Sequence, residues 1–309
     1  MTPALLIDPE TLPASFARPV LALGNFDGMH RGHRVVFSRT VSLAKERDVQ
    51  PGLLTFEPHP RAFFSPAVPL FRLTPPPIKR AVAGALGLPL LIEWTFDATL
   101  AGMTAEDFVE EILIRRLAVT AIVVGHDFHF GKARRGTPEF LTEAGRRLGF
   151  DVVVVDALQE GEIPISSTMI RQALEAGHVE EANRLLGYEW FVRATVRHGD
   201  KRGRDLGYPT ANLALDPACR LSHGIYAVRV TIDGAVHPGV ASFGRRPTFD
   251  NGAPLLEVHV FDFVGDLYEK TVDVAFVAWL RGEAKFDSID ALIVQMDDDS
   301  RRARAVLGA

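Results

Sequence analysis

The chain has 309 residues, 47% of them hydrophobic and 24% charged, so it can build sizeable globular cores, and its length favours two domains. Its net charge of -5 argues against a protein that coats nucleic acid, because such proteins normally carry a basic excess. Cys219 is the only cysteine, which excludes an intrachain disulfide and any zinc site built from cysteines.

The apolar segments are too short for a membrane protein. No run reaches the ~18 apolar residues of a membrane span. Residues 1–16 lack the basic start and long apolar stretch of a signal peptide. We therefore expect a cytoplasmic protein that contacts neither membrane nor nucleic acid.

Apolar runs alternate with helix-like segments through the first part of the chain. Residues 103–117 form the clearest helix, with Thr104 as N-cap and acidic residues in the first turn. Near-continuous apolar runs suit parallel strands buried on both faces, and alternation with helices predicts an α/β, doubly wound sheet. We assign residues 1–186 to this domain, with strands over 19–26, 52–56, 88–94, 120–125 and 151–158.

The pattern changes near Gly187. Two short helices, 166–177 and 178–187, each end at a glycine suited to a left-handed cap. A closing helix follows at about Ser288, and Asp297 to Asp299 could interrupt it. Closely spaced strands without helices predict an antiparallel β-barrel in a second domain, residues 187–309. Its expected strands are 190–198, 224–232, 235–243, 255–263 and 271–278.

The stretch GNFDGMHRGH, residues 24–33, follows the first strand predicted for the sheet. Ligands bind beyond the carboxyl ends of strands in such sheets, and the next helix start favours anions. Gly28 and Gly32 would let the backbone approach a phosphate. With a helix start near Met29, His30 and His33 share one face and could stabilise charge on a transferring phosphoryl group.

Other interpretations of this stretch remain open. The two histidines could be a solvated or structural pair, or zinc ligands, although no third ligand is nearby in the sequence. The stretch is neither a phosphate-binding loop with G-K-[ST] nor a G-x-G-x-x-G fingerprint.

Two other segments suit phosphate binding. SSTMIR, residues 166–171, places hydroxyls at a helix start and an arginine one turn later. GHDFHFGKARRG, residues 125–136, is a glycine-containing basic loop after a strand. The alternatives are a plain helix cap and a solvated loop. TFEPHP, residues 55–60, could be no more than a rigid turn.

GNFDGMHRGH also resembles the H-x-G-H signature of nucleotidyltransferases, and its longer form resembles the bacterial bifunctional riboflavin kinase/FAD synthetase family. Matching segments follow in order along nearly the whole chain, including HGDKRGRDLGYPTANL (198–213) and LEVHVFDF (256–263). The resemblance implies that the second half phosphorylates riboflavin to FMN. The first half then joins FMN to ATP, giving FAD and pyrophosphate.

The resemblance also assigns roles in the first half. His30 and His33 are catalytic and stabilise the ATP phosphates. Flavin-binding residues are Phe56, Pro58, His59 and Asp127. ATP-binding residues are Gly24, Phe26, Asp27, Gly32, Asp127, Ser166, Ser167, Thr168 and Arg171.

In the second half, the resemblance makes Glu257 the catalytic glutamate, which orients or deprotonates the ribityl hydroxyl. Thr210 and Asn212 would bind Mg²⁺; in an extended segment they point the same way, and their oxygens are hard ligands. Without the resemblance, Thr210 and Asn212 are more typical of a turn after a strand. Glu257 is then more typical of a solvent-facing residue in a strand. Gly203, Arg204 and Gly207 would cover the ATP phosphates.

Two positions depart from the family pattern: His129 stands where many members carry arginine, and Ser242 where asparagine is frequent. Three rival functions stay open: an enzyme that retains one of the two activities, a non-catalytic flavin-binding regulator, and an RNA-modifying or tRNA-charging enzyme. The net charge disfavours the last. The sequence predicts no oligomeric state.

Overall fold

The computed structural model describes residues 2–161, 163–198, 208–245 and 254–309. The chain divides into two compact units, Met1–Ser167 and Thr168–Ala309, and each is described by itself. The predicted domain boundary between residues 186 and 187 stays a prediction. Among the described residues, no helix combines the length and the apolar character needed to span a membrane.

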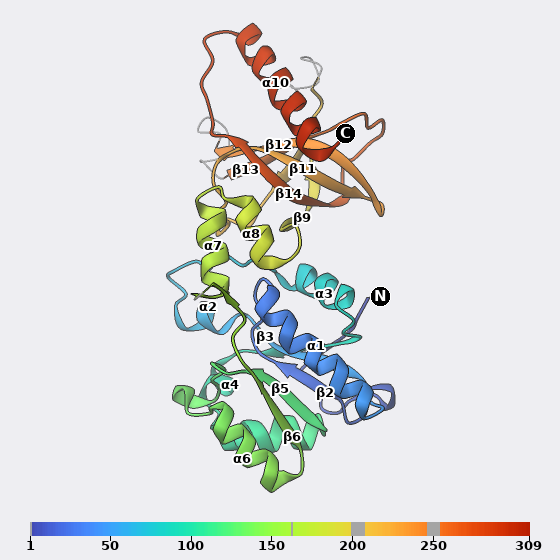
Figure 1. The fold of residues 1–309 in the computed structure, drawn as a ribbon, viewed down its shortest axis with the longest axis vertical. Helices are drawn as coiled ribbons and strands as arrows, with labels where there is room; N and C mark the ends of the chain where they lie inside the picture. Colours follow the sequence, from blue (N-terminus) through green and yellow to red (C-terminus); the bar gives the residue numbers. More distant parts are fainter. Residues whose placement is uncertain (1, 162, 199–207, 246–253) are drawn as a thin grey trace. The chain divides into compact units, whose positions relative to one another are not determined.

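A six-stranded parallel sheet forms the centre of the first unit (Figure 1). The order is β1-β4-β3-β2-β5-β6, so the predicted doubly wound α/β fold is confirmed. The strands are β1 (Ala4–Ile7), β2 (Val20–Leu23), β3 (Pro51–Glu57), β4 (Leu90–Thr95), β5 (Ala121–Gly125) and β6 (Asp151–Val155). Sequence analysis missed β1, a four-residue edge strand that pairs with β4.

Helices pack against this sheet, and α1 (Arg31–Glu46) contacts β2, β3 and β5. The predicted helix 103–117 is α5 (Ala105–Asp107) followed by the wider turns of η2 (Phe108–Arg116). Thr104 caps it as expected, accepting a hydrogen bond from Asp107 N at 3.0 Å. The other helical segments are η1 (Ala14–Phe16), α2 (Pro60–Phe64), α3 (Pro76–Ala85), α4 (Ala98–Gly102), η3 (Lys132–Arg134) and α6 (Pro138–Leu148). A small hairpin, β7 (Gln159–Glu160) with β8 (Ile163–Pro164), precedes α7.

The second unit is a closed barrel with strand order β10-β13-β12-β11-β14-β9, so the predicted antiparallel barrel is confirmed, although β10 was not among the predicted strands. Its strands are β9 (Phe191–Arg197), β10 (Ala211–Ala214), β11 (Gly224–Ile232), β12 (Ala235–Arg245), β13 (Pro254–Val260) and β14 (Thr271–Arg281). The helices α7 (Ser167–Glu175) and α8 (Val179–Leu186) precede it, and Asn183 of α8 donates to Phe276 O of β14 at 2.8 Å. Gly187 caps α8 in the predicted left-handed conformation.

The closing helix α10 (Ile289–Leu307) is continuous through Asp297 to Asp299, where the sequence left an interruption open. Asp299 is buried and accepts hydrogen bonds from Arg281 Nε at 2.9 Å and from the terminal nitrogen at 2.6 Å. A carboxylate paired with arginine in this way joins the helix to β14, so the acidic run is compatible with a continuous helix.

Candidate active sites

The β2–α1 connection has the tight turn that its glycines predicted. Gly28 has φ +84°, and Phe26 and Met29 also take positive φ values of +48° and +41°. The helix begins at Arg31, two residues after the predicted start, because His30 serves as its N-cap: its Nδ1 accepts from His33 N at 3.4 Å. Both histidines therefore belong to the helix start.

The two imidazole rings stack, with centroids 3.6 Å apart and an interplanar angle of 22°. A Cβ atom on Gly32 would lie 3.1 Å from the His30 ring, so glycine gives that ring its space. The Phe26 ring packs edge-on against His33 at 5.2 Å and against Phe37 at 4.8 Å. The pair is thus held in a packed environment.

Burial controls the charge of both histidines. It lowers the pKa of His30 to about 4, opposed by the negative charges of Asp27 and Asp127. Burial also lowers the pKa of His33 well below its ordinary value, and the positive charges of His30 and Lys79 add to this. At pH 7 both imidazoles are therefore neutral, and each can donate a hydrogen bond from its N–H group. They would carry a positive charge that neutralises a phosphate only if the bound anion raised their pKa values.

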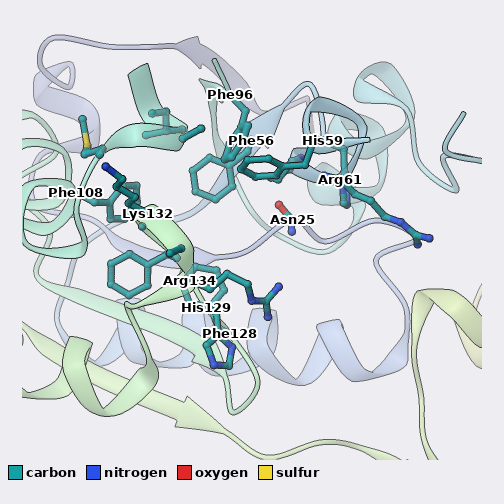
Figure 2. Close-up of a pocket in the computed structure, with 18 residues that line it drawn as sticks. Asn25, Phe56, His59, Arg61, Phe96, Phe108, Phe128, His129, Lys132 and Arg134 are labelled. Carbon is teal, nitrogen blue, oxygen red and sulfur yellow. The ribbon is translucent and has the colours of Figure 1, made fainter. Parts of the chain in front are cut away.

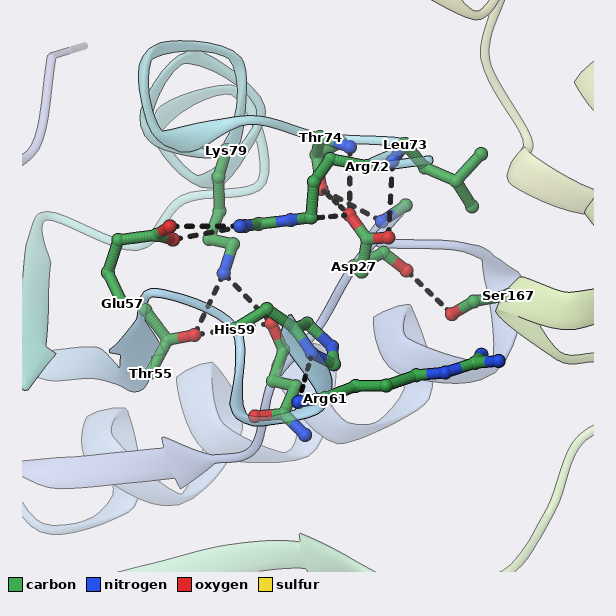
Figure 3. A network of polar contacts seen from close by, with 12 residues as sticks. Asp27, Thr55, Glu57, His59, Arg61, Arg72, Leu73, Thr74, Lys79 and Ser167 are labelled. Atoms are coloured by element: carbon green, nitrogen blue, oxygen red, sulfur yellow. Dashed lines mark hydrogen bonds and ion pairs between the residues drawn. The ribbon is translucent and has the colours of Figure 1, made fainter. Parts of the chain in front are cut away.

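The Asp27 carboxylate points inward from the turn (Figure 3). It accepts hydrogen bonds from Leu73 N at 3.1 Å and from Thr74 N at 2.9 Å, while Thr74 Oγ1 accepts from Gly28 N at 2.8 Å. The Asp27 carbonyl accepts from Ser167 Oγ at 2.8 Å. Asp27 therefore braces the turn from inside and joins it to the SSTMIR segment. Its assignment to ATP binding stays a prediction.

A buried cation lies beside this turn. Lys79 of α3, 1% exposed, donates from Nζ to the Asn25 carbonyl and to Thr55 Oγ1, both at 2.9 Å. Burial lowers the pKa of Lys79 to about 8. Nearby, Arg72 forms a two-pronged ion pair with Glu57, at 2.9 and 3.0 Å. The sequence carried no signal for Lys79, because lysine in a helix is normally exposed.

A cavity of about 780 Å³ opens in the first unit, and aromatic rings dominate its wall (Figure 2). The predicted flavin residues Phe56 and His59 line it, whereas Pro58 between them does not. His129 lines it in place of the expected arginine, and Arg61, Lys132 and Arg134 add positive charge. Sequence analysis missed most of the aromatic wall: Phe64, Phe96, Phe108, Phe128 and Phe130.

Most predicted ATP residues of the first unit lie around the histidine turn. Gly24, Phe26, Asp27 and Gly32 belong to it, and Ser166 precedes Ser167 at the start of α7. The exposed Asp127, on the loop after β5, is close enough to His30 to act on its pKa. Thr168 and Arg171 fall in the second unit, so their participation stays a prediction.

Two predicted residues of the second unit, Asn212 and Glu257, lie in one row across the barrel with Ser242, a position that departs from the family pattern. Asn212 of β10 pairs directly with Glu257 of β13, and Glu257 pairs with Ser242 of β12. Directly paired residues project from the same face of a sheet. On its other side Asn212 pairs with Arg197 of β9, which sequence analysis missed although strand alternation could have placed it on this face. Gly203, Arg204 and Gly207 lie outside the described residues.

Asn212 has the properties of a cation ligand. It is 8% exposed, and its Oδ1 has no hydrogen-bond partner among the described residues. Thr210 lies two positions earlier, directly before β10 begins at Ala211. Within the described part of the chain no group of three His, Cys, Asp or Glu residues could hold a metal ion. A hydroxyl and an amide oxygen suit Mg²⁺, which takes its remaining ligands from water and phosphate.

Comparison with known proteins decides the family. The FAD synthetase family profile matches residues 13–169, and the riboflavin kinase profile matches residues 186–307. The protein named bifunctional riboflavin kinase/FMN adenylyltransferase in Pseudomonas fluorescens is 40% identical over 93% of this chain and 92% of its own. The chain belongs to this family.

Other relatives agree. The protein of the same name in Escherichia coli K12 is 37% identical over 94% of this chain and 93% of its own. The one in Bacillus subtilis is 35% identical over 93% of this chain and 92% of its own. A crystal structure of a Streptococcus pneumoniae protein named as a macrolide-efflux protein has a TM-score of 0.86 at 32% identity, covering 97% of this chain and 98% of that one. The family thus accounts for both units, in the order that the sequence resemblance implied.

Proposed function

We propose that this chain makes FAD from riboflavin in two steps. The second unit transfers the γ-phosphoryl group of ATP to riboflavin, giving FMN and ADP. The first unit transfers AMP from ATP to FMN, giving FAD and pyrophosphate. The observation that supports this best is that each family match contains a cluster of the predicted site residues, the histidine turn in one and the Asn212–Glu257 row in the other.

In the adenylyl transfer, an FMN phosphate oxygen attacks the α-phosphorus of ATP as the bond to pyrophosphate breaks. His30 and His33 would donate hydrogen bonds to the phosphate oxygens, supported by the start of α1. The aromatic cavity suits a flat flavin ring, with Phe56 and His59 in its wall. Asp127, Ser166, Ser167, Thr168 and Arg171 would hold ATP.

In the kinase step, Glu257 would accept the proton of the ribityl 5′-hydroxyl as that oxygen bonds to the γ-phosphorus. Thr210 and Asn212 would hold Mg²⁺, which offsets phosphate charge when bound. The Asn212 oxygen, which has no hydrogen-bond partner among the described residues, supports this assignment. A reducing cytoplasm is the proposed location, since the chain has a single cysteine.

Separate loss of the two activities tests the proposal. With riboflavin, ATP and Mg²⁺, chromatography over time should show FMN and then FAD. His30→Ala combined with His33→Ala should stop FAD formation but not FMN formation. Glu257→Ala or Thr210→Ala should stop riboflavin phosphorylation while added FMN is still converted to FAD. Loss of both activities in every folded variant would contradict separate sites, and flavin binding without ATP consumption would indicate a regulator.

A further inference from the structure

Asn25 lies where the aromatic cavity meets the histidine turn. Its side chain lines the cavity together with those of Phe56 and Phe128 (Figure 2). The next residue, Phe26, packs against His33, and His30 is five positions further along the same connection. A ligand that occupied the cavity and also reached the histidines would pass Asn25.

Two buried groups fix the backbone of Asn25. Its carbonyl accepts from Lys79 Nζ at 2.9 Å and from Thr55 Oγ1 at 3.2 Å. The same lysine donates to Thr55 Oγ1, which closes a small network between β3, α3 and the turn (Figure 3). A charged donor forms the stronger kind of hydrogen bond, so Lys79 holds Asn25 in one place.

The Asn25 side chain, in contrast, has an unused acceptor. Its Oδ1 is buried and has no hydrogen-bond partner among the described residues. Buried acceptors are normally satisfied, so one that faces a cavity points to a donor on the bound ligand.

The chemistry of FMN identifies this donor, if the first unit adenylylates FMN as proposed above. Phosphate oxygens only accept hydrogen bonds. The donors of FMN are the imide N–H at the far edge of the ring and the hydroxyls of the ribityl chain. Because the phosphate must reach the histidines for attack on ATP, the ribityl chain that joins it to the ring passes Asn25.

We propose that Asn25 Oδ1 accepts a hydrogen bond from a ribityl hydroxyl of FMN, and that Lys79 positions Asn25 for this contact. The site would thereby distinguish the hydroxylated chain of FMN from a plain alkyl chain. The aromatic wall alone cannot make this distinction, because it contacts the ring through apolar surface.

A substrate comparison in the full chain tests the contact. The probe is an FMN analogue whose ring carries a 5-phosphopentyl chain without hydroxyls. The ratio of kcat/KM for FMN to that for the analogue should fall by about tenfold in Asn25→Ala, the size expected for one hydrogen bond to a buried acceptor. Asn25→Val, which keeps more of the volume, should give the same fall if the alanine variant folds poorly.

Lys79→Met tests positioning. It should lower the same ratio, because the lysine acts on the substrate through Asn25. Arg80→Met is the matched control: Arg80 is the next residue of α3, and its guanidinium donates to Pro3 O instead. It should leave the ratio unchanged.

The outcomes separate the two proposals. An unchanged ratio in both Asn25 variants, with both substrates slowed equally, would overturn the Asn25 contact while leaving FAD formation in place. An unchanged ratio in Lys79→Met would overturn the positioning role. No conversion of FMN by the unmodified chain would overturn the proposed function, and the Asn25 contact with it.

Discussion

Lys79 makes the first unit more stable as the pH rises from 8 to 10.5. Its neutral partners, Thr55 Oγ1 and the Asn25 carbonyl, only partly replace the water lost by its ammonium. Burial, followed by repulsion from Arg72, lowers the pKa of Lys79 from its ordinary 10.5 to about 8, against the opposing charges of Asp27, Glu57 and Glu93. The folded protein therefore releases this proton before the unfolded chain does.

The sign and size of the effect follow from proton linkage. Between pH 8 and 10.5 the unfolded state binds more protons at Lys79, so this residue's contribution to stability increases with pH. At 1.36 kcal/mol for each tenfold change in proton affinity, the total is about 3 kcal/mol, most of it gained below pH 10. Lys79→Met removes the titrating group, so the stability of the wild type relative to this variant should increase by that amount as the pH rises from 7.

The measurement requires a signal from the first unit alone. Trp94 is the only one of the three tryptophans in residues 1–167, so ¹⁹F NMR of chains labelled with 5-fluorotryptophan can follow that unit during urea unfolding. Other groups titrate in both proteins and cancel in the difference. Arg80→Met should parallel the wild type. A difference between wild type and Lys79→Met that stays constant from pH 7 to 10.5 would refute the reasoning.

Three further predictions concern other residues. Because the pKa of His30 falls from 6.5 to about 4 on folding, stability should drop as the pH falls through this range, and His30→Asn should reduce that drop in acid-unfolding curves. Gly32→Ala should slow FAD formation at least about tenfold in a two-product assay while FMN formation is unchanged, because its Cβ would displace the His30 ring. Asp299→Ala should destabilise the second unit by about 3 kcal/mol, because it leaves Arg281 without its carboxylate partner. Urea titrations followed by the signals of Trp190 and Trp279 measure this. A loss below ~1 kcal/mol would show that the pair contributes little.

Local patterns in the sequence carried much of the fold. The apolar runs at 52–56 and 120–125 became β3 and β5, because strands buried on both faces need continuous apolar side chains. Thr104 was predicted from its position before a helical pattern. The edge strand β1 was not predicted, because a strand of four residues gives too short a pattern to recognise.

The site residues that could be predicted were those close together in the sequence. The histidine turn is contiguous in sequence, so its residues could be found together. The aromatic cavity is not: Phe56, Phe96, Phe108 and Phe128 come from separate elements, and only the folded sheet brings them to one wall. The inward direction of Asp27 also depends on a distant segment, Arg72 to Thr74, that no local pattern connects to it.

The register of β13 has a consequence for how this chain can vary in length. Glu257 meets Asn212 and Ser242 only because three antiparallel strands are aligned residue for residue. Deleting one residue from β13 on either side of Glu257 would turn part of the strand over and exchange polar for apolar side chains on that stretch. Insertions in the connection between β10 and β11, residues 215–223, leave these pairings untouched, because that connection lies outside the three aligned strands.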